Sequence, residues 1–593
     1  MLPWTTYEAM TAAALTQPET FWLEAAQRIT WKQPPATACR VREDGWYDWF
    51  AGATLNTCHN ALDRHVENGR ADQTALIWHS CATKEQQNIT YGALQGRVAG
   101  FAGGLRALGV GKGDRVLISM PTMIETAIAM LACARLGAVH VVVFAGYAGP
   151  ELAARIDDVA PKVIITASCS FQGRTAISST PALLEALARA THTAQACIIV
   201  QRAACPARLM AGRDYDFHTL ELAAPVPPVP VMAEDPLYIL HTSGTTGKAK
   251  GIVRDNGGHA VALALSMELI YGCQPGDTFF TTSDLGWVVG HSYGVYAPLI
   301  SGCTSVIVEG SASASTIRTL CAEHAVTCLF TTPTQMRLIR QESRHICPPA
   351  PPTLARIFVA GEYADPTLLD WARSYFQRPV VNHWWQTETG WSITAHFFGL
   401  HEPEPTNLAN EIGRPAPGFR PVIAPALPGE PCGEIMLALP LPPGCLAGVW
   451  REHSIHAPDL YLDDTGQYYR SFDEGMIDTD HAVRMLGRSD DVIKVSGRRI
   501  SGIQIEKIIA IHPAVHSCAV VAVADTLRGQ RPVAYVVIDT GADTPPTADD
   551  LITEVNKTLG RWTGLRDIHF VEALPTTKSG KITRKALATA QSL

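Results

Sequence analysis

The sequence predicts an α/β protein with a large N-terminal domain of two parallel-type sheets, a small β subdomain and a small α/β C-terminal domain. Three observations predict this. Short β-branched runs alternate with helical stretches from about residue 91, which is typical of a parallel sheet covered by helices. Proline- and glycine-dense segments at 400–433 and 439–448 then change the pattern. The chain of 593 residues is also too long for a single hydrophobic core.

The elements follow in a simple order along the chain. Residues 1–80 are rich in tryptophan and tyrosine and predict an N-terminal extension over a larger body. Residues 81–489 hold two series of predicted strands, the first from residue 113 to 201 and the second starting with YILHTS at residue 238. Each series predicts one sheet. Residues 490–593 combine two helical and two strand-like stretches and predict a separate C-terminal domain.

Composition excludes several classes of protein. A formal net charge of −8 argues against general nucleic-acid binding, which needs a basic face. The fifteen cysteines form no CxxC pair and no compact Cys/His cluster, so we expect thiols in a reducing compartment and no zinc site. No stretch predicts a membrane span, and no basic and apolar N-terminal pattern predicts secretion, so we expect a cytoplasmic protein.

The strongest local pattern is LHTSGTTGKAKG at 240–251, directly after an apolar strand. Nine of the ten residues from Thr242 to Gly251 are Gly, Ser, Thr or Lys, which is too dense for an ordinary surface loop. Glycines allow the backbone N–H groups to approach an anion, and the hydroxyl and ammonium groups add donors and charge. The loop therefore predicts a polyphosphate site. It differs from a Walker A loop, because Ala249 follows Lys248 where that pattern needs Ser or Thr.

This loop resembles the first signature of the adenylate-forming superfamily of acyl-CoA synthetases, luciferases and peptide-synthetase adenylation domains. Three further motifs are similar to that family: WWQTETG at 384–390, SFDEGMIDTDHAVRMLGRSDDVIKVSGRRIS at 471–501 and LPTTKSGKITRKAL at 574–587. The resemblance covers almost the whole chain. It implies that ATP, Mg²⁺ and coenzyme A bind, and that the C-terminal domain is mobile about a hinge at Asp490.

The resemblance implies a role for individual residues. Lys581 would be the catalytic lysine, Glu388 would help to hold Mg²⁺, and Asp473 would accept the ribose hydroxyls, although Phe472 replaces the glycine that usually precedes this Asp. The implied ATP-binding set is Thr242, Ser243, Gly244, Thr245, Thr246, Gly247, Lys248, Gly361, Glu362, Asn382, His383, Trp384, Gln386, Thr387, Asp473, Arg488 and Arg499.

The segments at 44–65 and 283–299 are similar to those of acetyl- and propionyl-CoA synthetases. By this likeness the acyl pocket is lined by Trp287, Val288, Val289, Ala360 and Trp385, with Trp385 as a floor that admits only a short acid. Ala360 stands where acetate enzymes usually carry Val, which opens room for about one extra carbon, and about 0.8 kcal/mol per buried CH₂ would favour propionate. Acetate stays the alternative, and a substituted C3 acid would also fit.

For coenzyme A the resemblance implies Phe144 and Gly146 near the adenine and Arg155 or Arg174 near the phosphates. We therefore expect an AMP-forming short-chain acyl-CoA synthetase that acts on a small carboxylate. The rivals are an adenylation domain that loads a carrier protein and a non-catalytic nucleotide-binding homologue. Lys581 is also the kind of lysine that acylation switches off in this family, so lysine acylation and deacylation enzymes are candidate partners.

Overall fold

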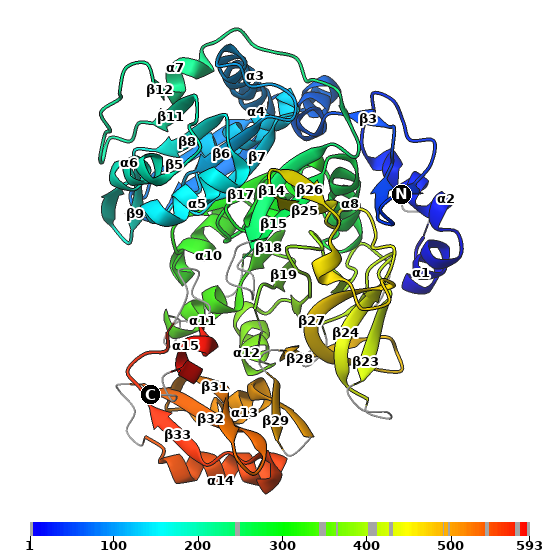
Figure 1. The fold of residues 1–593 in the computed structure, drawn as a ribbon, viewed down its shortest axis with the longest axis vertical. Coiled ribbons are helices and arrows are strands. Elements are labelled where there is room, and N and C mark those ends of the chain that lie inside the picture. Colours follow the sequence, from blue (N-terminus) through cyan, green and yellow to red (C-terminus); the bar gives the residue numbers. More distant parts are fainter. Residues whose placement is uncertain are drawn as a thin grey trace.

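The computed structural model describes residues 4–242, 250–342, 351–362, 364, 366–400, 412–425, 431–489, 492–495, 498–539, 545–575 and 582–589. Figure 1 shows two large helix-covered sheets, a small β subdomain beside them and a separate C-terminal unit at the lower end of the view. This arrangement confirms the predicted fold class.

A nine-stranded sheet forms one half of the large domain. Its neighbouring strands are parallel from one edge as far as β14, and the last three pairings are antiparallel. Helices α3 (Tyr91–Ala107) and α4 (Ile124–Leu136) pack on one face, and α5 (Gly149–Val159) and α6 (Thr180–Arg189) on the other. In order across the sheet the strands are β12 (Asp214–Asp216), β11 (Ala196–Val200), β8 (Val163–Ala167), β6 (Arg115–Ser119), β7 (Val139–Val143), β14 (Pro236–Thr242), β15 (Lys250–Asp255), β25 (Gly448–Arg451) and β26 (Ser454–His456).

Burial on both faces explains the composition of these strands. All five residues of β7, VHVVV, are buried, as expected of a central parallel strand between two helical layers. Helix α4 is buried along its whole length and ends at Gly137, whose φ of +71° closes the helix in a left-handed conformation. The prediction that YILHTS starts the second sheet was wrong, because β14 pairs with β7 and β15 in the first sheet.

A seven-stranded sheet forms the other half. Helices α10 (Ala314–Glu323), α11 (Pro333–Glu342) and α12 (Pro366–Phe376) cover its outer face, and α8 (Gly257–Leu269) lies in the core between the two sheets. β4 belongs to this sheet, although the predicted boundary of the N-terminal extension is at residue 80. In order the strands are β20 (Val380–Asn382), β19 (Arg356–Val359), β18 (Cys328–Thr331), β16 (Thr278–Thr281), β17 (Thr304–Glu309), β4 (Thr74–Ser80) and β5 (Gln86–Thr90).

The proline- and glycine-dense region leads into a four-stranded antiparallel sheet, the predicted β subdomain. Its strands are β23 (Pro421–Pro425), β24 (Gly433–Ala438), β27 (Tyr468–Ile477) and β28 (Val483–Arg488). The N-terminal segment contains α1 (Tyr7–Thr16), α2 (Pro18–Ala25), β1 (Cys39–Val41), β2 (Tyr47–Trp49) and β3 (Thr54–Leu55). Its aromatic residues join the main core: the rings of Trp22 and Trp49 lie 5.6 Å apart, edge to face.

The C-terminal unit has a core of its own, built around Ile493, Ile505 and Val520. Helix α14 begins at a capping box formed by Thr547 and Asp550. Its elements are β29 (Val492–Val495), β30 (Arg498–Ser501), α13 (Gly502–Ile509), β31 (Val515–Asp525), β32 (Gly529–Ile538), α14 (Ala548–Leu559), β33 (Asp567–Phe570) and α15 (Arg584–Thr589). Across the described ranges, no helix combines the length and the apolarity needed to cross a bilayer.

Candidate active site

A cavity of about 1440 Å³ lies where the large domain, the β subdomain and the C-terminal unit meet. It lies at the carboxyl ends of β14, β19 and β20, where ligands bind in open α/β sheets. Most of the predicted site residues that the structure describes line it: Thr242, Val288, Val289, Gly361, Glu362, Asn382, His383, Trp384, Trp385, Gln386, Thr387, Glu388, Asp473 and Arg488.

Asp473 is the centre of a polar network in the wall of this cavity. Its Oδ2 accepts hydrogen bonds from Trp384 Nε1 at 2.9 Å and Gln386 Nε2 at 2.7 Å, and its Oδ1 accepts one from Arg488 Nη1 at 3.2 Å. Burial raises the pKa of the Asp473 carboxyl, an effect that the Arg488 guanidinium opposes. A carboxylate has about four acceptor positions, so three protein donors already occupy most of them. The Arg488 side chain is 43% exposed and can move aside for a ligand hydroxyl.

Phe472 explains how the chain tolerates the loss of the usual glycine before Asp473. Its φ is +57°, the left-handed conformation that glycine adopts at no steric cost. The ring packs against the main core, and the guanidinium of Arg470 lies 4.9 Å above it. These contacts offset a backbone cost of about 1–2 kcal/mol for a residue with a Cβ. The backbone that orients Asp473 is therefore kept without glycine.

Glu388 lies beside the two ends of the predicted phosphate loop. Its Oε1 accepts a hydrogen bond from the Tyr461 hydroxyl at 2.9 Å, and Lys250 Nζ lies 4.9 Å from the centre of the Tyr461 ring. The Thr242 side chain also hydrogen-bonds to Tyr461. Burial and the neighbouring Glu388 carboxylate raise the pKa of Tyr461, so this phenol stays a neutral donor at physiological pH. Sequence analysis missed Tyr461, which lies outside the motifs in the short helix η5 (Asp459–Tyr461).

Arg254 was also missed, because β15 (KGIVRD) has charged residues at both ends and no motif singles out this arginine. Its side chain is fully buried and donates to the backbone carbonyl oxygens of Thr387, of Glu388 at 3.2 Å and of Gly444 at 2.6 Å. Its Nε lies 3.2 Å from the Tyr238 hydroxyl. A buried guanidinium with several fixed acceptors rigidifies the backbone that supplies them.

Several predicted residues lie outside the described residues: Ser243, Gly244, Thr245, Thr246, Gly247, Lys248, Asp490 and Lys581. For Arg499 the backbone in β30 is described and the side chain is not. The flanks of two of these segments do border the cavity. Thr242 and Lys250 line it on both sides of the phosphate loop, and Leu574 and Ile582 line it on both sides of Lys581. The N–H of Thr583 donates to the carbonyl oxygen of Pro575 at 2.8 Å, which closes the base of the lysine segment.

Comparison with known sequence families shows which family the chain belongs to. The chain matches the family described as AMP-binding enzyme over residues 62–442, its C-terminal domain over 504–581 and the acetyl-coenzyme A synthetase N-terminus over 7–61. The chain belongs to the adenylate-forming superfamily. Within it the chain is a short-chain acyl-CoA synthetase, an AMP-forming acid–thiol ligase that uses ATP, Mg²⁺ and coenzyme A.

Similar proteins cover the chain almost end to end. It is 44% identical to an uncharacterized protein of Pseudomonas aeruginosa, with 98% of this chain and 94% of that protein covered. It is 40% identical to human acyl-CoA synthetase short-chain family member 3, mitochondrial (98% and 87% covered), and 37% identical to propionate–CoA ligase of Salmonella typhimurium (97% and 94%). The solved acetoacetyl-CoA synthetase from Streptomyces lividans superimposes with a TM-score of 0.84 at 23% identity, covering 98% of this chain and 89% of that one, which supports the fold.

In this adenylate-forming enzyme, the predicted acyl-pocket residues are divided between the cavity and its surroundings. Val288, Val289 and Trp385 line the cavity, and the ring of Trp385 packs edge to face on Tyr293 at 5.5 Å. Ala360 is buried at the end of β19, in the core behind the cavity. Trp287 is 39% exposed and lies 6.3 Å from the ring of Phe144, so it faces the predicted coenzyme A residues.

The predicted coenzyme A residues lie outside the lining of the large cavity: Phe144 and Gly146 directly follow β7, and Arg155 is in α5. Gly146 is needed for its small size, because a Cβ there would come within 2.5 Å of the Phe144 ring. The Arg155 guanidinium lies 5.8 Å from the Tyr147 ring, and Arg174 is exposed in the turn between β9 (Cys169–Gln172) and β10 (Thr175–Ser178).

The chemistry of the donor set around Glu388 fits Mg²⁺. In the described part of the chain no group of three or more His, Cys, Asp or Glu side chains could hold a metal alone. Magnesium in phosphate-transfer sites is usually held by one or two carboxylates together with substrate phosphates. Glu388 supplies such a carboxylate next to the loop ends Thr242 and Lys250, and the remaining ligands would come from ATP and water.

Proposed function

We propose that this ligase prefers propionate, joining it to coenzyme A through a propionyl-adenylate. The single observation that carries the proposal is the shared cavity: a short apolar wall of Val288, Val289 and Trp385 opens beside the Asp473 network and Glu388. A carboxylate seated on that wall would lie close to the α-phosphate of a nucleotide whose ribose is held by Asp473. Acetate is the alternative substrate.

The reaction would proceed in two steps. A carboxylate oxygen attacks the α-phosphorus of ATP, the new O–P bond replaces the bond to pyrophosphate, and pyrophosphate leaves. The sulfur of coenzyme A then attacks the acyl carbonyl, the C–O bond to AMP breaks, and the thiol proton passes to solvent. Mg²⁺, held by Glu388, would neutralise phosphate charge. Thr387 would contact the α-phosphate, and the ammonium of Lys581 would offset negative charge in the first step.

The preference for a C3 acid rests on volume. Ala360 is buried in the core behind the cavity, and we expect a valine there to push the lining toward the acid by the volume of two methyl groups. Each buried CH₂ contributes about 0.8 kcal/mol, equivalent to roughly a fourfold preference for propionate over acetate. Trp385, packed on Tyr293, would limit the acid at the other end.

The direct test measures AMP release with Mg·ATP, coenzyme A and a series of C2 to C5 acids. We expect the highest kcat/KM with propionate, a lower value with acetate and a steep fall from C4. A maximum at acetate or at C5 would refute the preference. Pyrophosphate exchange separates the other rivals: a non-catalytic homologue shows none, and a carrier-loading enzyme shows exchange but produces no free acyl-CoA.

Further expectations concern the setting of the enzyme. The division into 1–80, 81–489 and 490–593, with a hinge at Asp490, stays a prediction. A cytoplasmic location is supported by buried free thiols such as Cys133 and Cys321, as expected of a reducing compartment. Lysine acylation at Lys581 would remove the charge that the first step needs. Mass spectrometry of the purified protein, compared with its adenylation activity, tests that regulation.

A further inference from the structure

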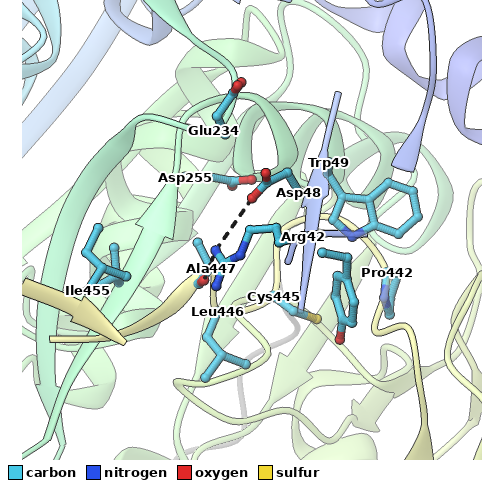
Figure 2. Close-up of a pocket in the computed structure, with 12 residues that line it drawn as sticks. Arg42, Asp48, Trp49, Glu234, Asp255, Pro442, Cys445, Leu446, Ala447 and Ile455 are labelled. Carbon is cyan, nitrogen blue, oxygen red and sulfur yellow. Dashed lines mark hydrogen bonds and ion pairs between the residues drawn. The ribbon is translucent and has the colours of Figure 1, made fainter. Parts of the chain in front are cut away.

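The segment 441–447 lies between the N-terminal segment and the turn that carries Glu388. Figure 2 shows Arg42, Asp48 and Trp49 on one side of this segment. On that side, Trp49 Nε1 donates to the carbonyl oxygen of Leu441 at 3.1 Å, and the N–H of Leu441 donates to the Tyr47 hydroxyl at 2.8 Å. At the other end Arg42 Nη1 donates to the carbonyl oxygen of Ala447 at 3.4 Å. The N-terminal segment therefore holds both ends of 441–447.

On its other side the segment 441–447 is hydrogen-bonded to the turn that carries Glu388. The N–H of Leu446 donates to the carbonyl oxygen of Glu388 at 2.8 Å. Arg254 joins the two by donating to the carbonyl oxygens of Gly444 at 2.6 Å and Glu388 at 3.2 Å. Trp391 Nε1, three residues after Glu388, donates to the carbonyl oxygen of Pro443 at 3.0 Å. The backbone of Glu388 is thus held by two donors that do not reach the cavity.

The contact between the segment 441–447 and the turn that carries Glu388 is tightly packed, which limits how far the turn can shift. Gly390 has a φ of +73°, and a Cβ there would come within 2.4 Å of the Gly444 carbonyl oxygen and 2.6 Å of the Arg254 guanidinium carbon. Gly444 has a φ of +84°, and a Cβ there would come within 2.4 Å of the Ala262 side chain. Close-packed groups with satisfied hydrogen bonds transmit displacement instead of absorbing it.

We propose that Arg254 is a positioning residue for Glu388, and that the N-terminal segment acts on the metal site by clamping 441–447 against the same turn. The inference deepens the proposed function, because it rests on Glu388 as the Mg²⁺-binding carboxylate. Arg254 supplies three carbonyl contacts from a planar fork, and a lysine of the same charge cannot reproduce them. Partners that orient a metal ligand typically change metal affinity by 10- to 100-fold when they are lost.

The test is a direct binding measurement. The dissociation constant of Mn²⁺ is measured by electron paramagnetic resonance on the full-length enzyme saturated with a non-hydrolysable ATP analogue, and AMP affinity is measured without metal. We expect Arg254→Lys to weaken Mn²⁺ binding by about tenfold and to leave AMP affinity unchanged. Tyr47→Phe removes the hydroxyl that accepts from the N–H of Leu441, at the start of the segment 441–447. It should also weaken Mn²⁺ binding, by less than Arg254→Lys does.

Matched controls separate positioning from a general loss of stability. Arg135→Lys breaks another buried arginine cluster, in which Arg135 pairs with Asp63 at 2.7 Å, and Tyr91→Phe removes another buried hydroxyl, bonded to the Cys303 carbonyl oxygen at 2.7 Å. Neither residue lines the cavity, so neither control should change Mn²⁺ affinity. Should Arg254→Lys fail to fold, Tyr47→Phe carries the test against Tyr91→Phe.

Glu388→Gln distinguishes failure of the inference from failure of the proposed function. If Glu388→Gln weakens Mn²⁺ binding while Arg254→Lys and Tyr47→Phe match their controls, the positioning role is refuted and the metal role of Glu388 stands. If Glu388→Gln leaves Mn²⁺ affinity unchanged, the assignment of Glu388 itself fails. Weaker Mn²⁺ binding in Glu388→Gln, Arg254→Lys and Tyr47→Phe, with unchanged controls, supports the whole chain of contacts.

Discussion

Replacing Asp473 with asparagine keeps the shape of the side chain and removes its charge. The carboxylate accepts from Trp384, Gln386 and Arg488 in the wall of the cavity, and we expect it to accept the two ribose hydroxyls of ATP. A hydrogen bond to a charged group contributes about 1.5–3 kcal/mol against about 1 kcal/mol for a neutral pair. The loss is then about 1 kcal/mol for each hydroxyl and about 2 kcal/mol in all, which corresponds to roughly a 30-fold weaker affinity.

The assay is isothermal titration of the wild type and the variant with ATP and with 2′,3′-dideoxy-ATP. Removing the hydroxyls should weaken binding to both proteins, and the wild type should lose roughly 30-fold more affinity than Asp473→Asn, because each hydroxyl bond to the carboxylate is about 1 kcal/mol stronger than the bond to the amide. Asp478→Asn is the control, since Asp478 caps a surface turn by accepting from the N–H of Ala482 at 2.9 Å. An equal loss of ATP and dideoxy-ATP affinity in Asp473→Asn would refute the ribose assignment.

Four further outcomes follow from the same geometry. Ala360→Val should lower the propionate-to-acetate ratio of kcat/KM by about fourfold, measured by AMP release, and an unchanged ratio removes Ala360 from the acyl pocket. Lys581→Ala should abolish pyrophosphate exchange and largely retain thioester formation from supplied propionyl-adenylate; equal loss of both steps contradicts its role. Phe472→Gly should unfold at a higher temperature than Phe472→Ala, because only glycine relieves the +57° φ; the reverse order would exclude backbone strain at this position. Adenosine affinity should fall as pH is lowered through the raised pKa of Asp473, since only the ionised carboxylate accepts both hydroxyls, and the Asp473→Asn curve should be flat.

The sequence by itself determined the chemistry that this protein can perform. The relevant patterns are local: the composition of the loop at 242–251, Glu388 in WWQTETG and Lys581 near the C-terminus. Phosphate binding depends on such local backbone geometry and charge. The alternation of apolar strands and helices predicted the α/β fold for the same reason, because burial on both faces of a parallel sheet leaves a direct mark on composition.

Only the tertiary structure decided which residues support that chemistry. β14 pairs with β7 and so belongs to the first sheet. This pairing joins segments that are far apart in the sequence, and strand composition does not specify such a partner. Tyr461 reaches Glu388, and Arg254 reaches the carbonyl oxygens of Thr387 and Glu388, across more than seventy residues of chain. Phe472 keeps a glycine-like φ, and its ring packs against the main core of the large domain. Such roles arise from packing between distant segments, and no pattern of neighbouring residues encodes them.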